Sequence, residues 1–255
     1  MSISTLTVDS LVVEIHPDKA ALSQAAADFV AGYIRAAIAE RGSSRVIFAT
    51  GASQYDFLDA LCAAPEIDWS LVTAFHLDEY VGIAADHPAS FRRYLQERLF
   101  SRLPFAAVHL LTGDAPEPVA ECRRYAALLT EAPIDIACVG IGENGHLAFN
   151  DPPADFYTTA AVHIVELDEA CRRQQVGEGH FPDLAAVPPQ ALSMTVPAIL
   201  DAKVISCVVP DARKAAAVHC TLEGPIDPAC PASALRTHPH CRLYLDSASA
   251  GQLSR

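Results

Sequence analysis

The sequence has no surplus of positive charge, no long uncharged apolar run and no pair of cysteines spaced as CxxC. Its 255 residues have a formal net charge of −13 at pH 7, which argues against a nucleic-acid partner because a phosphate backbone requires a basic patch. No apolar run is long enough to span a membrane. The first residues, MSISTLTVDSLVVEIH, also lack the basic start and apolar core of a signal peptide.

The cysteines predict a reducing environment. There are eight, at positions 62, 122, 138, 171, 207, 220, 230 and 241. Most lie in apolar or helical contexts, which is typical of reduced thiols in a cytoplasmic protein without structural zinc. The histidines do not repeat at ligand spacing either, so we expect neither a metal nor another cofactor.

Predicted strands alternate with predicted helices along the chain. Hydrophobic residues make up 51% and charged residues 19%, which argues against disorder. The pattern predicts an α/β fold, namely a doubly wound, mainly parallel sheet with helices on both faces (Rossmann-like). We expect a single domain over residues 1–255. Within it, residues 154–189 show little periodicity, and we predict an irregular lid there.

The segment Ile134–Pro153, IDIACVGIGENGHLAFNDPP, combines a buried strand with a glycine-rich turn. Its apolar start, Ile134–Val139, is too short for a helix and is bounded by proline and glycine. The turn then gathers polar side chains within nine positions: Glu143, Asn144, His146, Asn150 and Asp151. Loops at the carboxyl ends of parallel strands are where ligands bind. The alternative is that the glycines serve only the turn and the polar groups cap the next segment of the chain.

A second polar turn, Thr50-Gly51-Ala52-Ser53, separates the strand Arg45–Ala49 from the helix Tyr55–Cys62. Exposed N–H groups at such a helix start can bind an anion, and the two hydroxyls can add donors. The alternative is a simple helix cap by Ser53. The turn is not a Walker loop, because the GxxxxGK pattern is missing.

A third polar turn, Asp78–Tyr80, follows the strand Trp69–Leu77, and Lys214 lies just beyond the strand Lys203–Val209. A half-buried carboxylate at such an edge has a raised pKa and can act as a base. In a parallel sheet these strand ends share one edge, so the polar turns can converge on one crevice. Such a set of groups suits a phosphorylated metabolite that undergoes proton transfer.

These residues occur within longer motifs. In chain order they are TGAS (50–53), FHLDEYVG (75–82), HPASF (87–91), GIGENGHLAFNDP (140–152), RK (213–214), TLEGP and THPH. The combination resembles the glucosamine-6-phosphate deaminases and, through them, the superfamily that includes 6-phosphogluconolactonase. The motifs extend over most of the chain.

The resemblance implies that glucosamine 6-phosphate and water give fructose 6-phosphate and ammonia. It makes Asp78 the base that moves a proton between C2 and C1, and His146 the residue that assists ring opening. Asn144 and Asp151 would orient His146. The phosphate of this amino sugar phosphate would be held by these residues: Thr50, Gly51, Ala52, Ser53, Lys214 and either Arg172 or Arg173. Without the resemblance, Lys214 would be interpreted as a lysine on a helix surface. The two arginines would be interpreted as a solvated pair.

Three departures from the family pattern affect specificity. In the phosphate loop, the family commonly has a second Gly or a Ser, followed by Thr-Pro. This chain has Ala52, Ser53 and Gln54 at those positions. Asn144 replaces a frequent Asp, and Asp151 replaces a usual Glu with a side chain one methylene shorter. These changes allow a preference for another amino sugar 6-phosphate. The alternatives are a 6-phosphogluconolactonase-type hydrolase and a non-catalytic sugar-phosphate sensor. The sequence leaves monomer or homo-oligomer undecided.

Overall fold

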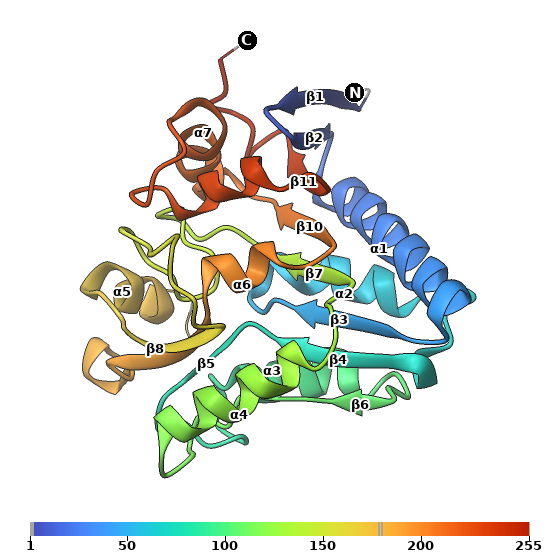
Figure 1. Ribbon diagram of the computed structural model, residues 1–255. Coiled ribbons are helices and arrows are strands. Elements are labelled where there is room, and N and C mark those ends of the chain that lie inside the picture. Colours follow the sequence, from blue (N-terminus) through green and yellow to red (C-terminus); the bar gives the residue numbers. More distant parts are fainter. Residues whose placement is uncertain (1–2, 178, 180, 255) are drawn as a thin grey trace.

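A mainly parallel sheet runs through the part of the chain that the computed structural model describes, residues 3–177, 179 and 181–254 (Figure 1). Its eight strands lie in the order β1 (Ser4–Val8), β2 (Leu11–His16), β11 (Cys241–Asp246), β10 (Val204–Val209), β7 (Ile136–Val139), β3 (Ser44–Phe48), β4 (Val72–His76) and β6 (Ala107–Val108). β1 pairs antiparallel with β2, and the other neighbours pair in parallel.

Both faces of this sheet are covered by helices. The described helices are α1 (Lys19–Arg41), α2 (Tyr55–Cys62), α3 (Phe91–Leu95), α4 (Pro118–Thr130), α5 (Glu169–Gly177), α6 (Val196–Leu200) and α7 (Ala215–Glu223). Figure 1 shows α4 and α6 on the near side of the strands and α2 on the far side. Within the described ranges, no helix has both the length and the apolar character to cross a bilayer.

The two faces have separate apolar cores because strand side chains alternate. Val46 and Phe48 pack with α1, α2 and α3, whereas Ile47 between them packs with α4, α6 and α7. Ile136 and Ala137 divide between the two cores in the same way. The expected doubly wound, mainly parallel α/β fold is therefore confirmed.

The first long helix shows how the sequence sets its own boundaries. Asp18 accepts a hydrogen bond from the N–H of Ala21 at 2.9 Å and so caps α1. Gly42 ends the helix in the left-handed region at φ +77°, which glycine adopts without strain. The helix predicted over Pro17–Glu40 is confirmed.

A small second sheet lies beside the first. It is antiparallel, in the order β5 (Asp78–Tyr80), β9 (Gln190–Met194) and β8 (Val162–Glu166). Asp78–Tyr80 is therefore a strand and not the expected polar turn. The prediction of an irregular segment over 154–189 is also wrong where β8 and α5 form, although positions 178 and 180 lie outside the described residues. These short elements are stabilised by packing around Tyr80, Phe149 and Phe181, which local periodicity does not reveal.

Short 3₁₀ and π turns connect several of these elements. The 3₁₀ turns are η1 (Ala52–Gln54), η2 (Trp69–Leu71), η4 (Leu184–Ala186), η5 (Ala212–Lys214) and η6 (Pro231–Thr237), and η3 (Gln96–Phe100) is π-helical. Two of them, η1 and η5, begin just beyond the carboxyl ends of β3 and β10. They bring Ser53 and Lys214 to the same edge of the sheet.

Candidate active site

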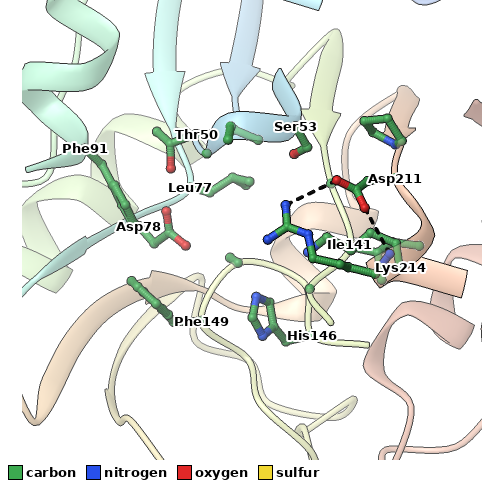
Figure 2. Close-up of a pocket in the computed structure, with 18 of the residues that line it drawn as sticks. Thr50, Ser53, Leu77, Asp78, Phe91, Ile141, His146, Phe149, Asp211 and Lys214 are labelled. Atoms are coloured by element: carbon green, nitrogen blue, oxygen red, sulfur yellow. Dashed lines mark hydrogen bonds and ion pairs between the residues drawn. The ribbon is translucent and has the colours of Figure 1, made fainter. Parts of the chain in front are cut away.

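One cavity of about 200 Å³ opens at the carboxyl ends of four neighbouring strands, β10, β7, β3 and β4. Its walls include most of the residues predicted from sequence, together with several that were not: Lys19, Thr50, Gly51, Ala52, Ser53, Asp78, Phe91, Gly142, His146, Phe149, Gln175, Asp211, Arg213 and Lys214. Figure 2 shows Asp78 and His146 extending toward the same space, with Thr50 and Ser53 along another side.

Asp78 is a buried carboxylate that lines this cavity. Its residue is only 7% exposed. Burial raises the pKa of Asp78 well above its usual value, and the negative charge of Glu79 raises it further. A carboxyl group held in this way retains a proton more strongly than a surface aspartate, so it can act as a base near neutral pH.

The neighbouring Glu79 has a different environment. Its carboxylate accepts hydrogen bonds from Ser90 Oγ at 2.7 Å, from the N–H of Arg92 at 3.0 Å and from Arg92 Nε at 3.2 Å. It therefore satisfies the first N–H groups of α3, where a negative charge is favourable. Because Glu79 turns away from the cavity and Asp78 toward it, the strand alternation of β5 gives two adjacent acids different surroundings.

His146 lies over the glycine-rich turn after β7. A Cβ atom at Gly142 would lie 2.3 Å from the His146 ring, so only glycine leaves room for the imidazole at this position. Nδ1 of His146 lies 3.1 Å from Asp151 Oδ1. A carboxylate only accepts hydrogen bonds, so Nδ1 bears the proton and Nε2 is left for the cavity.

Asp151 and Asn144 hold that imidazole. Asn144 Nδ2 donates to Asp151 Oδ1 at 2.9 Å, and its Oδ1 accepts from the backbone N–H of His146 at 3.1 Å. Burial alone would raise the pKa of Asp151, but hydrogen bonds from His146 and Asn144 hold it below its usual value. The shorter Asp151 side chain thus still reaches His146, and the amide of Asn144 orients both groups.

Asn150 closes the same loop. Its Nδ2 donates to the carbonyl oxygens of Leu147 and Met194, each at 2.7 Å, and its Oδ1 lies 3.0 Å from His163 Nε2. Because its hydrogen bonds join the loop to β8 and β9, we assign Asn150 to the support of the site and not to the chemistry.

The predicted anion-binding turn comes directly after β3. Gly51 has φ +100°, a conformation that strains any residue with a Cβ atom. The Tyr94 hydroxyl donates to the carbonyl of Gly51 at 2.9 Å, and Gln54 Nε2 donates to the carbonyl of Val208 at 3.2 Å. These two bonds fix the turn between α3 and β10, so Ser53 and the backbone of Ala52 face the cavity in a set geometry.

Three cationic side chains line the described part of the cavity: Lys19, Arg213 and Lys214. Lys214 is buried and lies on the far side from Asp78 (Figure 2). Arg213 pairs with Asp211 at 3.3 Å and Glu143 at 3.6 Å. Lys19 pairs with Asp56 at 3.3 Å, next to the anion-binding turn. The cavity is therefore lined by three cationic side chains, two of which are paired with acidic neighbours.

Neither of the two predicted arginines is among the described residues that line the cavity, and the assignment of phosphate binding to one of them stays a prediction. Arg172 Nη2 donates to the carbonyl oxygens of Leu184 and Val187, at 2.6 and 3.1 Å. Arg173 is 69% exposed at its side chain and pairs with Glu169 on the same helix. The reason is the direction of α5, which points both side chains away from the cavity and directs Gln175 toward it.

Sequence reasoning missed Lys19, Gln175 and the supporting roles of Gln54 and Tyr94. Lys19 starts a helix that precedes the first recognised motif, and Tyr94 lies three residues beyond HPASF. Gln175 lies four positions after Cys171, a spacing that places both on one face of a helix. The spacing would have indicated that Gln175 lies on the buried face with Cys171, but only if residues 169–177 had been predicted as a helix.

The chain matches known proteins over almost its whole length. Residues 17–243 match the family model for glucosamine-6-phosphate isomerases/6-phosphogluconolactonase. A glucosamine-6-phosphate deaminase of Exiguobacterium sp. is 39% identical over 186 residues, covering 73% of this chain and 72% of the relative. One of Listeria innocua is 39% identical over 205 residues, covering 80% of this chain and 86% of the relative.

Solved structures agree with these matches. A monomeric glucosamine-6-phosphate deaminase superposes with a TM-score of 0.87 at 32% identity, over 94% of this chain and 99% of that one. A 6-phosphogluconolactonase from Trypanosoma brucei gives 0.79 at 17% identity, over 98% and 100%, which is a likeness of fold alone. The chain therefore belongs to the family of glucosamine-6-phosphate isomerases and 6-phosphogluconolactonases.

Proposed function

We propose that this protein is a glucosamine-6-phosphate deaminase, which converts glucosamine 6-phosphate and water to fructose 6-phosphate and ammonia. One observation carries the proposal. A buried carboxylate with a raised pKa, Asp78, and an imidazole fixed by Asp151 and Asn144 line the same cavity as an anion-binding turn. The relatives at 39% identity are named for this reaction.

Ring opening is assigned to His146. Nε2 faces the cavity, and the bond from Nδ1 to Asp151 stabilises the imidazolium that forms when Nε2 takes a proton. In the pyranose, this proton comes from the C1 hydroxyl and returns to the ring oxygen as the C1–O5 bond breaks. The products are an open-chain aldehyde and the C5 hydroxyl.

Asp78 then moves the proton on carbon. Its carboxylate removes the proton from C2 of the aldehyde. The enolate oxygen that forms takes a proton from the ammonium group on C2, which leaves an enol with a neutral amino group on C2 and the C2 proton on Asp78. Returning a proton to C1 makes C2 an iminium carbon, which water attacks to release ammonia and give the ketose. A base whose pKa lies near the operating pH is most efficient in both directions, and burial supplies that raised pKa.

The phosphate is assigned to the opposite end of the cavity. Thr50, Gly51, Ala52 and Ser53 offer N–H and hydroxyl donors at the start of η1 and α2. Lys214 adds a buried positive charge, and Lys19 and Arg213 add further charge at the rim. Phosphate binding by Arg172 or Arg173 stays a prediction. The partner is thus a small amino sugar phosphate.

The test is release of ammonia from glucosamine, galactosamine and mannosamine 6-phosphates, run beside hydrolysis of 6-phosphogluconolactone. We expect ammonia and fructose 6-phosphate in equal amounts from the glucosamine ester. Lactone hydrolysis without ammonia release would instead assign the chain to the other branch of the family. A preference for another epimer would keep the chemistry and change the substrate.

A further inference from the structure

We propose that the thiol of Cys171 is a positioning residue for catalysis, donating its S–H to Oδ2 of Asp151 and so fixing the carboxylate that holds His146. The inference rests on the proposed deaminase function. It concerns a residue of α5, the helix that comes after β8, and it extends the His146–Asp151 pair to a third group.

The first observation concerns Asp151. Both bonds described above, from Asn144 and from His146, go to Oδ1. Oδ2 is buried, and no hydrogen-bond donor reaches it at full bonding geometry among the described residues. A buried carboxylate oxygen without a partner is costly, and the group can rotate about its χ2 bond unless something holds it.

The second observation is the position of Cys171. It is 1% exposed, and its Sγ, a carboxylate oxygen of Asp151 and a ring nitrogen of His146 all lie within 4.8 Å of one another. The thiol and the carboxylate influence each other: the nearby Cys171 thiol lowers the pKa of Asp151, while burial and the Asp151 charge raise the pKa of the thiol. The thiol therefore stays protonated and available as a donor.

The third observation is that α5 is held firmly on both sides of this cysteine. Asp168 accepts from the N–H of Cys171 at 2.6 Å and so fixes the start of the helix. One turn later, Gln175 accepts a 2.7 Å hydrogen bond from the Tyr80 hydroxyl and lines the cavity. The inner face of α5 thus presents Cys171 to Asp151 and Gln175 to the substrate space. Arg172, on another face, anchors the helix to Leu184 and Val187.

The experiment compares Cys171→Ala, which removes the donor, with Cys171→Ser, which retains an O–H donor. Both are measured by kcat and KM for ammonia release from glucosamine 6-phosphate. We expect C171A to lower kcat about tenfold with KM within about twofold, because orientation of the catalytic imidazole is lost and phosphate binding is not. C171S should restore most of kcat. Cys122→Ala, at a buried helical cysteine of α4, is the matched control and should keep wild-type kcat.

A double-mutant cycle separates positioning from packing. In an Asp151→Asn background, C171A should lower kcat no further, because the bond it removes acts through that carboxylate. Equal kcat in C171A and wild type, or equal loss in C171S and C171A, overturns the proposal. Should C171A not fold, Cys171→Val fills the space without a donor and tests the same expectation. A wild-type enzyme that releases no ammonia would instead overturn the proposed function.

Discussion

Two aspartates at opposite edges of the sheet differ in their partners. Asp78, beyond the carboxyl end of β4, and Asp135, just before the amino end of β7, are each 7% exposed. Asp135 accepts hydrogen bonds from Lys203 Nζ and from the N–H of Arg45, both at 2.9 Å, and from Arg41. For Asp78, burial and the charge of Glu79 both raise its pKa, and no donor among the described residues opposes them.

The two aspartates are equally buried, so burial alone does not separate a structural carboxylate from a candidate catalytic one. The hydrogen-bond partners of the carboxylate do. The hollow around Asp135 has a volume of about 310 Å³, larger than the roughly 200 Å³ beside Asp78. Size alone would therefore select the wrong edge. A paired carboxylate stabilises the fold, whereas a carboxylate left to a cavity keeps a perturbed pKa that catalysis can use.

The strongest test of this difference is Asp78→Asn. We expect kcat for ammonia release to fall by about 10³-fold or more, because the amide cannot accept the C2 proton. Binding of the sugar phosphate, measured by calorimetry, should change little because the shape of the side chain is kept. A variant with the wild-type rate would remove Asp78 from the role of base.

Glu79→Gln tests whether the neighbouring acid is structural. Removing a buried charge that pairs with Arg92 and caps α3 should lower the free energy of unfolding by about 3 kcal/mol. Because the Glu79 charge also raises the pKa of Asp78, the acid limb of the pH profile of kcat should move to lower pH. The matched control is Glu97→Gln, at an exposed pair with Arg93, for which we expect about 0.5 kcal/mol or less.

One lysine at each edge of the sheet tests the phosphate-binding assignment in the same way: Lys214 beside the cavity and Lys203 beside Asp135. Lys214→Ala should raise KM about 30-fold, close to 2 kcal/mol of lost phosphate binding, with little change in kcat. Lys203→Ala, which removes the partner of Asp135 at the other edge, should leave KM unchanged. An unaltered KM in the first variant would remove Lys214 from the phosphate site.

Asp135→Asn should give the reverse of the Asp78 result. Losing charge-assisted bonds to Lys203, Arg41 and the Arg45 N–H should lower the free energy of unfolding by about 2 kcal/mol, measured by urea denaturation. The rate of ammonia release per folded molecule should remain that of the wild type. A loss of activity at full stability would contradict the structural role assigned to this edge.

The smallest expected effect is on stability as a function of pH. The pKa of Asp78 is higher in the folded protein than in the unfolded chain, so the unfolded chain loses its proton first as pH rises. The wild type should therefore lose stability from about pH 4 up to the folded pKa, and then level off. At pH 8, D78N should be more stable than the wild type by about 1 kcal/mol or more. The difference should vanish near pH 4, and denaturant titrations of both proteins at the two pH values measure it.

Much of the site was predictable because its residues come directly after strands in the sequence. The run Ile134–Val139 predicts a buried strand, and the glycines after it predict a tight turn near His146; both are present. Thr50–Ser53 and Lys214 were placed at the same edge by the rule that parallel strand ends align. The order of the strands along the chain was sufficient for this prediction, because right-handed crossover connections bring the carboxyl ends of successive parallel strands to the same edge of the sheet.

The sequence by itself determined the doubly wound sheet and its carboxyl edge, since hydrophobic periodicity and glycine positions are local properties, and its motifs made Asp78 and His146 the candidate catalytic residues. Only the tertiary structure decided that Glu79 caps α3, that Arg172 and Arg173 lie away from the cavity, and that Lys19 and Gln175 line it. These outcomes depend on the rotation of α5 and on packing around Tyr80. Such packing is set by contacts between residues far apart in the chain, which no local pattern encodes.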